Sequence, residues 1–440
     1  MGMMTNIFMK TAILVSLLFT VAITSSAKRR NINYDESKIA PYTLPDPLIC
    51  NDGTKVTTTE QWERVRRPEL LKLFEEHIYG ETPKGKLNVR YKVVAKKSDA
   101  LNGKATAQQV MFTFSRKGKK HKALALVYYP NNRKERVPVF IGYNFKGNHC
   151  TSNDRWVLYS PYYYEGITDL SSKLLKRGTQ TERWPLEEII ERGYAVVTMC
   201  YHDIYPDVTP RKAQPRDLVR LSNLLPVTED DNSRWQAIGV WAYGLSRIAD
   251  WVERQPWADR EKFCVIGHSR QGKAALWAGV QDKRFKVVIS NNSGCGGAAL
   301  SKRVIGENVE FITRQFPHWF CKNFTKYGMR ERDLPIDQHE LLALVAPRHL
   351  YVASASLDRW ADPKGEYLAT YHASPVFELY GMKGMTSAEM PEIEQPTIND
   401  VGYHIRQGKH NITLYDWRNY LDFCDKIFNK RGINRGFRVD

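Results

Sequence analysis

Cysteine is scarce in this chain. The 440 residues contain seven cysteines, and no two of them are spaced as C-x-x-C. This scarcity argues against a zinc site and against a disulfide-rich scaffold, because both require closely spaced thiols. The sequence implies no metal ion and no organic cofactor. Low-complexity tracts and evident repeats are also absent, so the 42% of hydrophobic and 12% of aromatic residues favour an ordered globular protein with a substantial core.

A hydrophobic run of transmembrane length is also missing. The apolar stretch at residues 11–23 follows Lys10 and precedes residues 25–27, which are small side chains typical of a signal-peptide cleavage site. This stretch is shorter than the roughly 20 residues that a membrane-spanning helix needs. We therefore expect residues 1–27 to be a signal peptide. The mature protein is then secreted or periplasmic, without stable membrane insertion.

Basic residues are in excess but form no continuous stripe. Lys and Arg number 65 against 48 acidic residues, for a net charge of +17. They are scattered along the chain rather than interleaved with aromatic residues, so no nucleic-acid partner is predicted. A basic surface on an exported protein favours approach to an anionic polymer such as an acidic polysaccharide. We expect the protein to be a monomer.

Short apolar runs alternate with helical patterns through most of the chain. Seven runs are predicted strands: residues 123–129, 138–144, 195–200, 262–267, 286–292, 349–356 and 376–381. Their continuous apolar character is typical of strands that are buried on both faces. The alternation predicts an α/β protein, a three-layer αβα sandwich with a mostly parallel central sheet.

Helical spacing is clearest in three places. One helix is expected near residues 235–252, capped by Asp231 or Ser233, and the last helix is expected at 414–428. In the third, five side chains share one helix face: Trp62, Leu70, Leu71, Leu73 and Phe74. We interpret residues 28–105 as an N-terminal extension of a single catalytic domain that spans residues 28–440.

Long loops follow several of the predicted strands. They are residues 145–183, 201–232, 300–340 and 382–409. In open α/β sheets the loops at the carboxyl ends of the strands form the ligand crevice. The binding site is therefore expected at that edge of the sheet.

The segment CVIGHSRQGKAALWAG, residues 264–279, has the pattern of a strand, a sharp turn and a helix. It places Ser269 at the turn, in a G-x-S-x-x-G spacing whose second glycine is one position later than in a nucleophile elbow. Gly267 allows the tight turn, and Gly272 is small where helix and strand pack closely. The amides at the start of the helix favour negative charge beside the serine. Ser269 is the predicted nucleophile.

A serine hydroxyl needs a base that accepts its proton. In α/β-hydrolases the acid and then the histidine follow the serine along the chain. His410, just before the last predicted helix, is the predicted base. His404 is the other candidate, and it is interpreted as a structural residue. Asp358 directly follows the strand at 349–356 and is the predicted acid; Asp362 is near it, with a turn cap as its alternative role. The remaining histidines are expected to make fixed hydrogen bonds, including His268, His318 and His339.

Several segments, in order, carry a family resemblance. They are IGHSRQGKAALWAGVQDKRFKVVISNNSGCGGAAL, GENVEF, FPHWFCKNF, LPIDQHELLALVAPRHLYVASASLDRWADPKGE and GYHIRQGKHNITLYDW. Through them the chain resembles the bacterial type of the glucuronoyl esterases, carbohydrate esterases of α/β-hydrolase fold. The resemblance implies a serine esterase that cleaves esters of (4-O-methyl-)glucuronic acid, as in lignin–carbohydrate linkages on glucuronoxylan. Two alternatives stay open: an acetyl xylan or other carbohydrate esterase, and a non-catalytic polysaccharide-binding relative.

The resemblance also implies roles for individual residues. The family's SRxGK element corresponds to Ser269 as nucleophile, Arg270 as the side chain that stabilises the oxyanion, and Lys273 as a ligand of sugar hydroxyls. The sugar-contacting glutamate corresponds to Glu307 and the sugar-stacking tryptophan to Trp360. Each sugar contact has a structural alternative: a solvated charge for Lys273, a salt bridge to Arg303 for Glu307, and a core position for Trp360.

The sequence departs from the fungal members of this family in two respects. Asn292 stands where they have the acid of the triad, so Asp358 has to supply the carboxylate. Some bacterial members likewise have an aspartate after the later strand. Fungal members also have cysteines next to the serine and the histidine, whereas this chain has His268 and Asn411. The corresponding disulfide is therefore not expected. A different bridge, Cys295 to Cys321, is the hypothesis that remains.

Overall fold

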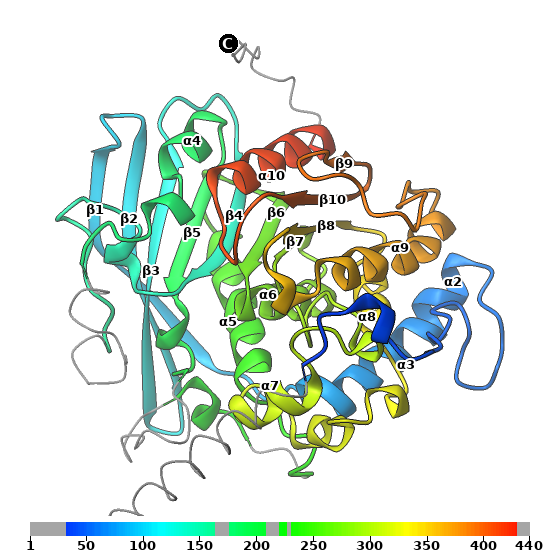
Figure 1. The fold of residues 1–440 in the computed structure, drawn as a ribbon. Coiled ribbons are helices and arrows are strands. Elements are labelled where there is room, and N and C mark those ends of the chain that lie inside the picture. Colours follow the sequence, from blue (N-terminus) through cyan, green and yellow to red (C-terminus); the bar gives the residue numbers. More distant parts are fainter. Residues whose placement is uncertain (1–31, 163–175, 208–219, 227–229, 429–440) are drawn as a thin grey trace, which may run out of the picture.

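A mixed β-sheet forms the centre of the protein (Figure 1). The computed structural model describes residues 32–162, 176–207, 220–226 and 230–428. Within these residues ten strands pair in the order β1-β2-β3-β5-β4-β6-β7-β8-β10-β9. The strands are β1 Asn88–Ala100, β2 Ala105–Arg116, β3 Lys119–Pro130, β4 Val137–Asn144, β5 Ala195–Cys200, β6 Ala258–His268, β7 Phe285–Asn291, β8 His349–Ala355, β9 Thr397–Ile398 and β10 Val401–Arg406.

The middle of the sheet is parallel. The strands β5, β4, β6, β7, β8 and β10 run in one direction, and every residue of β4 and β5 is buried. At one edge β1, β2 and β3 add antiparallel pairs, and at the other β9 pairs antiparallel with β10. The predicted α/β fold with a mostly parallel central sheet is confirmed, and six of the seven predicted strands are present.

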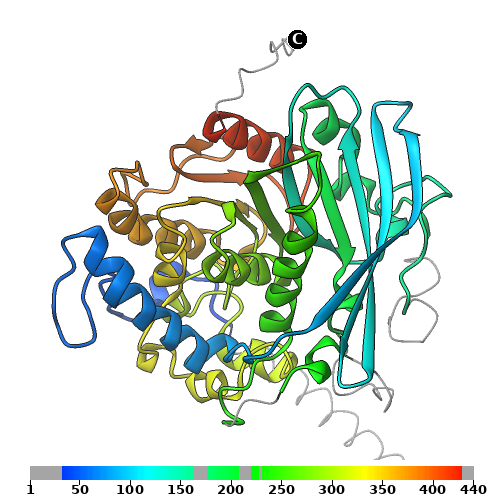
Figure 2. The same ribbon diagram turned by 180° about the vertical axis from the view of Figure 1, so that it is seen from behind.

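Helices cover both faces of the sheet (Figures 1 and 2). The helices are α2 Thr59–Gln61, α3 Arg67–Phe74, α4 Leu186–Glu191, α5 Ala237–Val252, α6 Arg270–Gln281, α7 Val309–Gln315, α8 Gln338–Ala343, α9 Pro363–Leu379 and α10 Leu414–Ile427. The apolar side chains of α5, α6, α8 and α9 belong to one core, and those of α4 and α10 to a second. Residues of β4 alternate between the two cores, with Val139 and Ile141 in the first and Phe140 in the second. This is the predicted three-layer αβα sandwich.

The predicted strand at 376–381 is wrong, because these residues end helix α9 and continue into a turn. Ala369, Ala373, Val376 and Phe377 are all buried in this helix, and their spacing is that of one helix face. The strand in this part of the sheet is instead β10, inside the segment 382–409 that was expected to be a loop. Its buried polar residues concealed it, as described below.

The start of helix α5 also differs from the prediction. Neither Asp231 nor Ser233 caps it, and the helix begins after Gln236 without a side-chain cap. Its first two amides, those of Ala237 and Ile238, donate instead to the carbonyl oxygens of His318 and Trp319. Contacts distant in the sequence therefore replace the local cap. The last predicted helix, at 414–428, is present as α10.

The described residues before β1 contribute a helical stretch that packs on the core. A continuous helical stretch runs from α2 through two π-helical segments, Trp62–Arg66 and Glu75–Tyr79, which flank α3. The side chains of Trp62, Leu70 and Phe74 are fully buried in the first core. Leu71 and Leu73 are half-buried and pack against the same core. The predicted signal peptide lies outside the described residues.

Candidate active site

Ser269 lies at the turn between β6 and α6. Its φ of 57° and ψ of −130° are unusual for a residue with a side chain, and such strain is typical of a nucleophile elbow. A Cβ atom on Gly267 would lie 1.9 Å from the carbonyl oxygen of Gln271, and one on Gly272 would lie 2.9 Å from Cβ of Ser293. Both glycines are therefore required by close packing. Gly272 allows the close contact between helix and strand although it lies one position later than in the usual elbow pattern.

His410 and Asp358 form a hydrogen-bonded pair. Nδ1 of His410 lies 2.5 Å from Oδ2 of Asp358. The carboxylate is buried, while 41% of the His410 side chain is exposed. With Nδ1 bound to the carboxylate, Nε2 is the nitrogen that remains for proton transfer. Ser269, Arg270 and His410 line one cavity of about 300 Å³.

The two rival residues have structural partners. His404 is fully buried on β10, where its ring nitrogens bind Asp416 at 2.9 Å and the hydroxyl of Tyr351 at 3.0 Å. Asp362 accepts the amide of Gly365 at the start of α9 and forms an ion pair with Arg303. The cavity beside Ser269 is lined by His410, and neither rival contributes to it.

Arg270 is held from two sides. It forms an ion pair with Asp207, and its guanidinium carbon lies 4.7 Å from the centre of the Trp319 ring. Asp207 also accepts hydrogen bonds from Nε2 of His318 at 2.7 Å and from Nε1 of Trp319 at 2.8 Å. Burial raises the pKa of Asp207, but the hydrogen bond from His318 and the charge of Arg270 outweigh it and hold the pKa well below its usual range. Asp207 was not predicted from the sequence, because no motif surrounds it.

The three predicted sugar contacts are close to one another. Nζ of Lys273 lies 3.8 Å from Oε2 of Glu307 and donates to the carbonyl oxygen of Cys295 at 2.7 Å. The amide of Glu307 donates to the carbonyl oxygen of Trp360, and the Trp360 side chain is hydrogen-bonded to the Glu307 carboxylate. Burial raises the pKa of Glu307 and lowers that of Lys273.

The structural alternatives for these three residues do not apply. Lys273 is 3% exposed, so it is no solvated surface charge. Arg303 pairs with Asp362 and Glu36 rather than with Glu307. Trp360 is half-buried and not part of either apolar core.

Asn292 occupies the position of the acid in the fungal triad. Its side-chain amide contacts residues 407–413, the loop between β10 and α10 that carries His410 and is called the base loop below. Its φ of 45° lies in the left-handed region that asparagine tolerates. Nδ2 donates to the carbonyl oxygen of Asn411 at 3.0 Å, while Oδ1 is buried without a hydrogen-bond partner among the described residues. Asn292 therefore binds the backbone next to His410 and supplies no carboxylate.

A buried glutamate, Glu366, binds the loop after β7 and was not predicted from the sequence. Oε1 of Glu366 accepts the amides of Ser293 and Gly294 at 2.7 and 3.0 Å, and Oε2 accepts the hydroxyl of Ser354 at 2.6 Å. Burial raises the pKa of Glu366 to about 8, and the charge of Asp358 acts in the same direction. No sequence signal marks this residue, because its partners lie in two distant segments, the loop after β7 and strand β8.

The proposed bridge between Cys295 and Cys321 is wrong. All seven cysteines lie among the described residues, and the structure contains no disulfide between them. The thiol of Cys321 is directed at the carbonyl oxygen of Glu76, 3.5 Å away. Its position is thus set by the N-terminal helical stretch.

The fold and this cavity place the protein among the carboxylic ester hydrolases of α/β-hydrolase fold. A family model described as glucuronyl esterase of fungi matches residues 229–381. The carbohydrate esterase MZ0003, from an unknown prokaryotic organism, is 41% identical over 94% of this chain and 98% of its own length. The chain therefore belongs to the glucuronoyl esterases, carbohydrate esterase family 15, and the resemblance seen in the motifs is confirmed.

Two further relatives agree with this assignment. The solved structure of a glucuronoyl esterase from Solibacter usitatus is 41% identical, with a TM-score of 0.80, and the match covers 88% of this chain and 99% of that one. A 4-O-methyl-glucuronoyl methylesterase from Schizophyllum commune is 27% identical over 77% of this chain and 74% of its own length. None of the described helices combines the length and hydrophobicity that a membrane crossing requires.

Proposed function

We propose that this protein is a secreted serine esterase that hydrolyses esters of (4-O-methyl-)glucuronic acid, including those that join glucuronoxylan to lignin alcohols. The observation that carries the proposal is the hydrogen bond between His410 and Asp358 beside the cavity that also contains Ser269. The names of the relatives support the uronic acid part of the substrate.

The reaction proceeds in two displacements. His410 takes the hydroxyl proton of Ser269, and the oxygen attacks the ester carbonyl. Arg270 and backbone amides at the start of α6 stabilise the oxyanion. The C–O bond to the alcohol then breaks, and His410 returns the proton to the leaving oxygen. A water molecule, deprotonated by the same imidazole, hydrolyses the acyl-enzyme and restores Ser269.

The uronic acid ring is bound by Lys273, Glu307 and Trp360. A buried ammonium and a buried carboxylate, 3.8 Å apart, offer a donor and an acceptor to neighbouring sugar hydroxyls. Trp360 presents an indole whose apolar face stacks on a sugar ring. Because Lys273 is one turn of α6 away from Ser269, sugar binding and ester attack are coupled through one helix.

The decisive assay compares a benzyl glucuronate ester with acetylated xylan. Hydrolysis of the glucuronate ester is expected, and it is expected to be lost in Ser269→Ala, because no other group replaces the nucleophile. Ser246→Ala, a change in α5 away from the cavity, is the matched control. Wild-type turnover in Ser269→Ala would refute the assignment of Ser269 as the nucleophile. Activity on acetylated xylan alone would favour the acetyl esterase alternative.

Export belongs to the same proposal. The leader at residues 1–27 directs the chain out of the cytoplasm, where a polymeric substrate is accessible. N-terminal sequencing of the exported protein is expected to begin after Ala27. An uncleaved N-terminus on the exported chain would contradict the signal peptide.

A further inference from the structure

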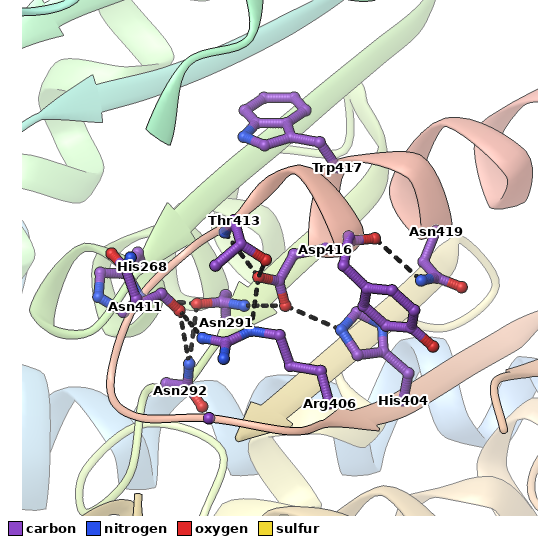
Figure 3. A network of polar contacts seen from close by, with 12 residues as sticks. His268, Asn291, Asn292, His404, Arg406, Asn411, Thr413, Asp416, Trp417 and Asn419 are labelled. Atoms are coloured by element: carbon purple, nitrogen blue, oxygen red, sulfur yellow. Dashed lines mark hydrogen bonds and ion pairs between the residues drawn. The ribbon is translucent and has the colours of Figure 1, made fainter. Parts of the chain in front are cut away.

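The loop that carries His410 is backed by a network of buried polar side chains (Figure 3). The network joins the ends of β6, β7 and β10 to the first turn of α10. Its members are His268, Asn291, Asn292, His404, Arg406, Asn411, Thr413 and Asp416. Six of them are buried, the exceptions being Asn411 and Thr413.

Arg406 is the member that holds the base loop. Its Nη2 donates to the carbonyl oxygens of Lys409 and Asn411, at 3.0 and 2.6 Å. These two residues flank His410 in the chain. Nη1 donates to the carbonyl oxygen of Gln407 at 3.1 Å. One guanidinium therefore binds the backbone on both sides of the imidazole, in a fork geometry that lysine lacks.

Asp416 holds Arg406 in turn. Its Oδ2 accepts Nε of Arg406 at 2.8 Å and both the amide and the hydroxyl of Thr413. Its Oδ1 accepts Nε2 of His404 at 2.9 Å and Nδ2 of Asn291 at 3.1 Å. Burial raises the pKa of Asp416, but the hydrogen bond from His404 and the charge of Arg406 lower it by more. The carboxylate is thus ionised and uses both oxygens.

The same network reaches the nucleophile through two consecutive residues. The carbonyl oxygen of Asn291 accepts the amide of Ser269 at 2.9 Å, and its Oδ1 lies 2.6 Å from Nδ1 of His268. Nδ2 of Asn292 donates to the carbonyl oxygen of Asn411 at 3.0 Å. The backbone of the nucleophile and the backbone beside the base are therefore attached to the same end of β7.

Stability alone does not account for this arrangement. A buried ion pair contributes little net free energy relative to apolar side chains of similar size, because both charges lose their hydration. Arg406 is 3% exposed and Asp416 is fully buried. What such a network does provide is one fixed geometry at its centre, since each nitrogen of the Arg406 guanidinium and each carboxylate oxygen of Asp416 has a defined partner.

We propose that Arg406 is a positioning residue for His410. Asp416 holds the guanidinium of Arg406, and Asn292 donates to the carbonyl oxygen of Asn411, which Arg406 also binds. The inference rests on the proposed function, because it takes His410 as the base. The exposed imidazole is bound to Asp358 by one nitrogen only, so the placement of the other nitrogen depends on the backbone that carries the ring.

The test replaces Arg406 by lysine, which keeps a positive charge beside Asp416 but cannot span two carbonyl groups. The matched control is Arg348→Lys. Arg348 is also buried, and its Nη1 donates to the carbonyl oxygens of Asp282 and Phe285 near the start of β7, at the opposite end of the parallel strands. Both variants lose buried hydrogen bonds, and only one of them affects the base loop.

Turnover is measured with a benzyl glucuronate ester and with p-nitrophenyl acetate. Arg406→Lys is expected to lower kcat about 10- to 100-fold, since a displacement of 1 Å at a catalytic group costs about that much. KM is expected to change less than about twofold, because the loss occurs only in the transition state. Arg348→Lys is expected to lower the melting temperature without this loss of kcat.

A second comparison separates positioning from general damage. In a His410→Ala background, Arg406→Lys is expected to leave the residual rate within about twofold, since no imidazole remains to be placed. Equal losses with and without His410, or a kcat of Arg406→Lys that matches Arg348→Lys, would overturn the proposal. If wild-type protein cleaves p-nitrophenyl acetate but no glucuronate ester, the proposed function fails while the test of Arg406 still stands.

Discussion

At the scale of single residues, the proposed site combines a buried carboxylate as the acid with an exposed imidazole as the base. Asp358 is 5% exposed, whereas His410 keeps 41% of its side chain in solvent. A buried carboxylate stabilises the imidazolium more strongly than an exposed one, because solvent screens it less. The exposed imidazole can meet a large substrate and a water molecule.

Asp358→Asn is expected to reduce kcat by on the order of 10³ to 10⁴, because the amide favours the wrong imidazole tautomer. Turnover of a benzyl glucuronate ester measures this. The control is Asp362→Asn, four residues further on, which breaks a buried ion pair with Arg303. That variant is expected to lose stability and to keep its kcat. Wild-type turnover in Asp358→Asn would mean that another acid, or none, supports His410.

Glu366 predicts a pH dependence of stability. Its pKa is raised by burial to about 8, so between the ordinary value of 4.5 and about 8 the folded protein keeps a proton that the unfolded chain releases. This contribution to stability is complete below pH 4.5 and is lost as the pH rises through about 8.

The matched variant is Glu366→Gln, which keeps the shape and the acceptor for both amides. Between pH 5 and 8, the free energy of unfolding of wild type is expected to fall relative to this variant by about 1 kcal/mol per pH unit. Urea titrations at several pH values measure the difference. Parallel curves for the two proteins would show that Glu366 is ionised in the folded state across this range.

At the scale of elements, the strand-to-helix turn depends on the absence of a side chain at Gly267. Gly267→Ala is expected to cost on the order of 3 kcal/mol and to displace Ser269, because the new Cβ would lie 1.9 Å from a backbone oxygen. Gly53→Ala is the control: its φ is positive at 87° but nothing lies within 4 Å, so about 1 kcal/mol is expected. Thermal unfolding compares the two, and equal costs would contradict the close approach.

Element prediction succeeded where the pattern was local. Continuous apolar runs with turns between them predicted six strands correctly, and the elbow was recognisable from its own residues. Strand β10 was missed because His404 and Arg406 interrupt its apolar pattern. They are buried only because Asp416, on α10, pairs with both. The segment at 376–381 was misassigned because a short apolar run has the same appearance at a helix end.

At the scale of the whole molecule, the N-terminal helical stretch is joined to the rest by a buried ion pair. Nη2 of Arg66 lies 2.8 Å from Oε1 of Glu340 on α8, and both side chains are at most 5% exposed. This contact links residues that are distant in the sequence. It supports the proposal that residues 28–440 fold as one domain.

Arg66→Met is expected to destabilise the protein by about 3 kcal/mol or more, because it leaves the carboxylate of Glu340 buried without its partner. Arg64→Met is the matched control on the same helical stretch. Its ion pair with Glu60 is exposed by 77% and 68%, so a change below about 0.5 kcal/mol is expected. Denaturant unfolding measures both, and a single transition is expected for wild type. A separate early transition would show that the N-terminal stretch unfolds independently.

The sequence by itself determined the fold class, because apolar periodicity is local, and its ordered motifs carried the resemblance that identified the family and predicted the residues of the site. Tertiary structure alone decided which groups hold those residues in place. Asp207 beside Arg270, Glu366 beneath the loop after β7, and the network of Arg406 and Asp416 behind His410 all depend on contacts between distant segments. Burial sets the charge and the partners of these groups, and burial becomes defined only when the sheet and its two helical layers have packed together.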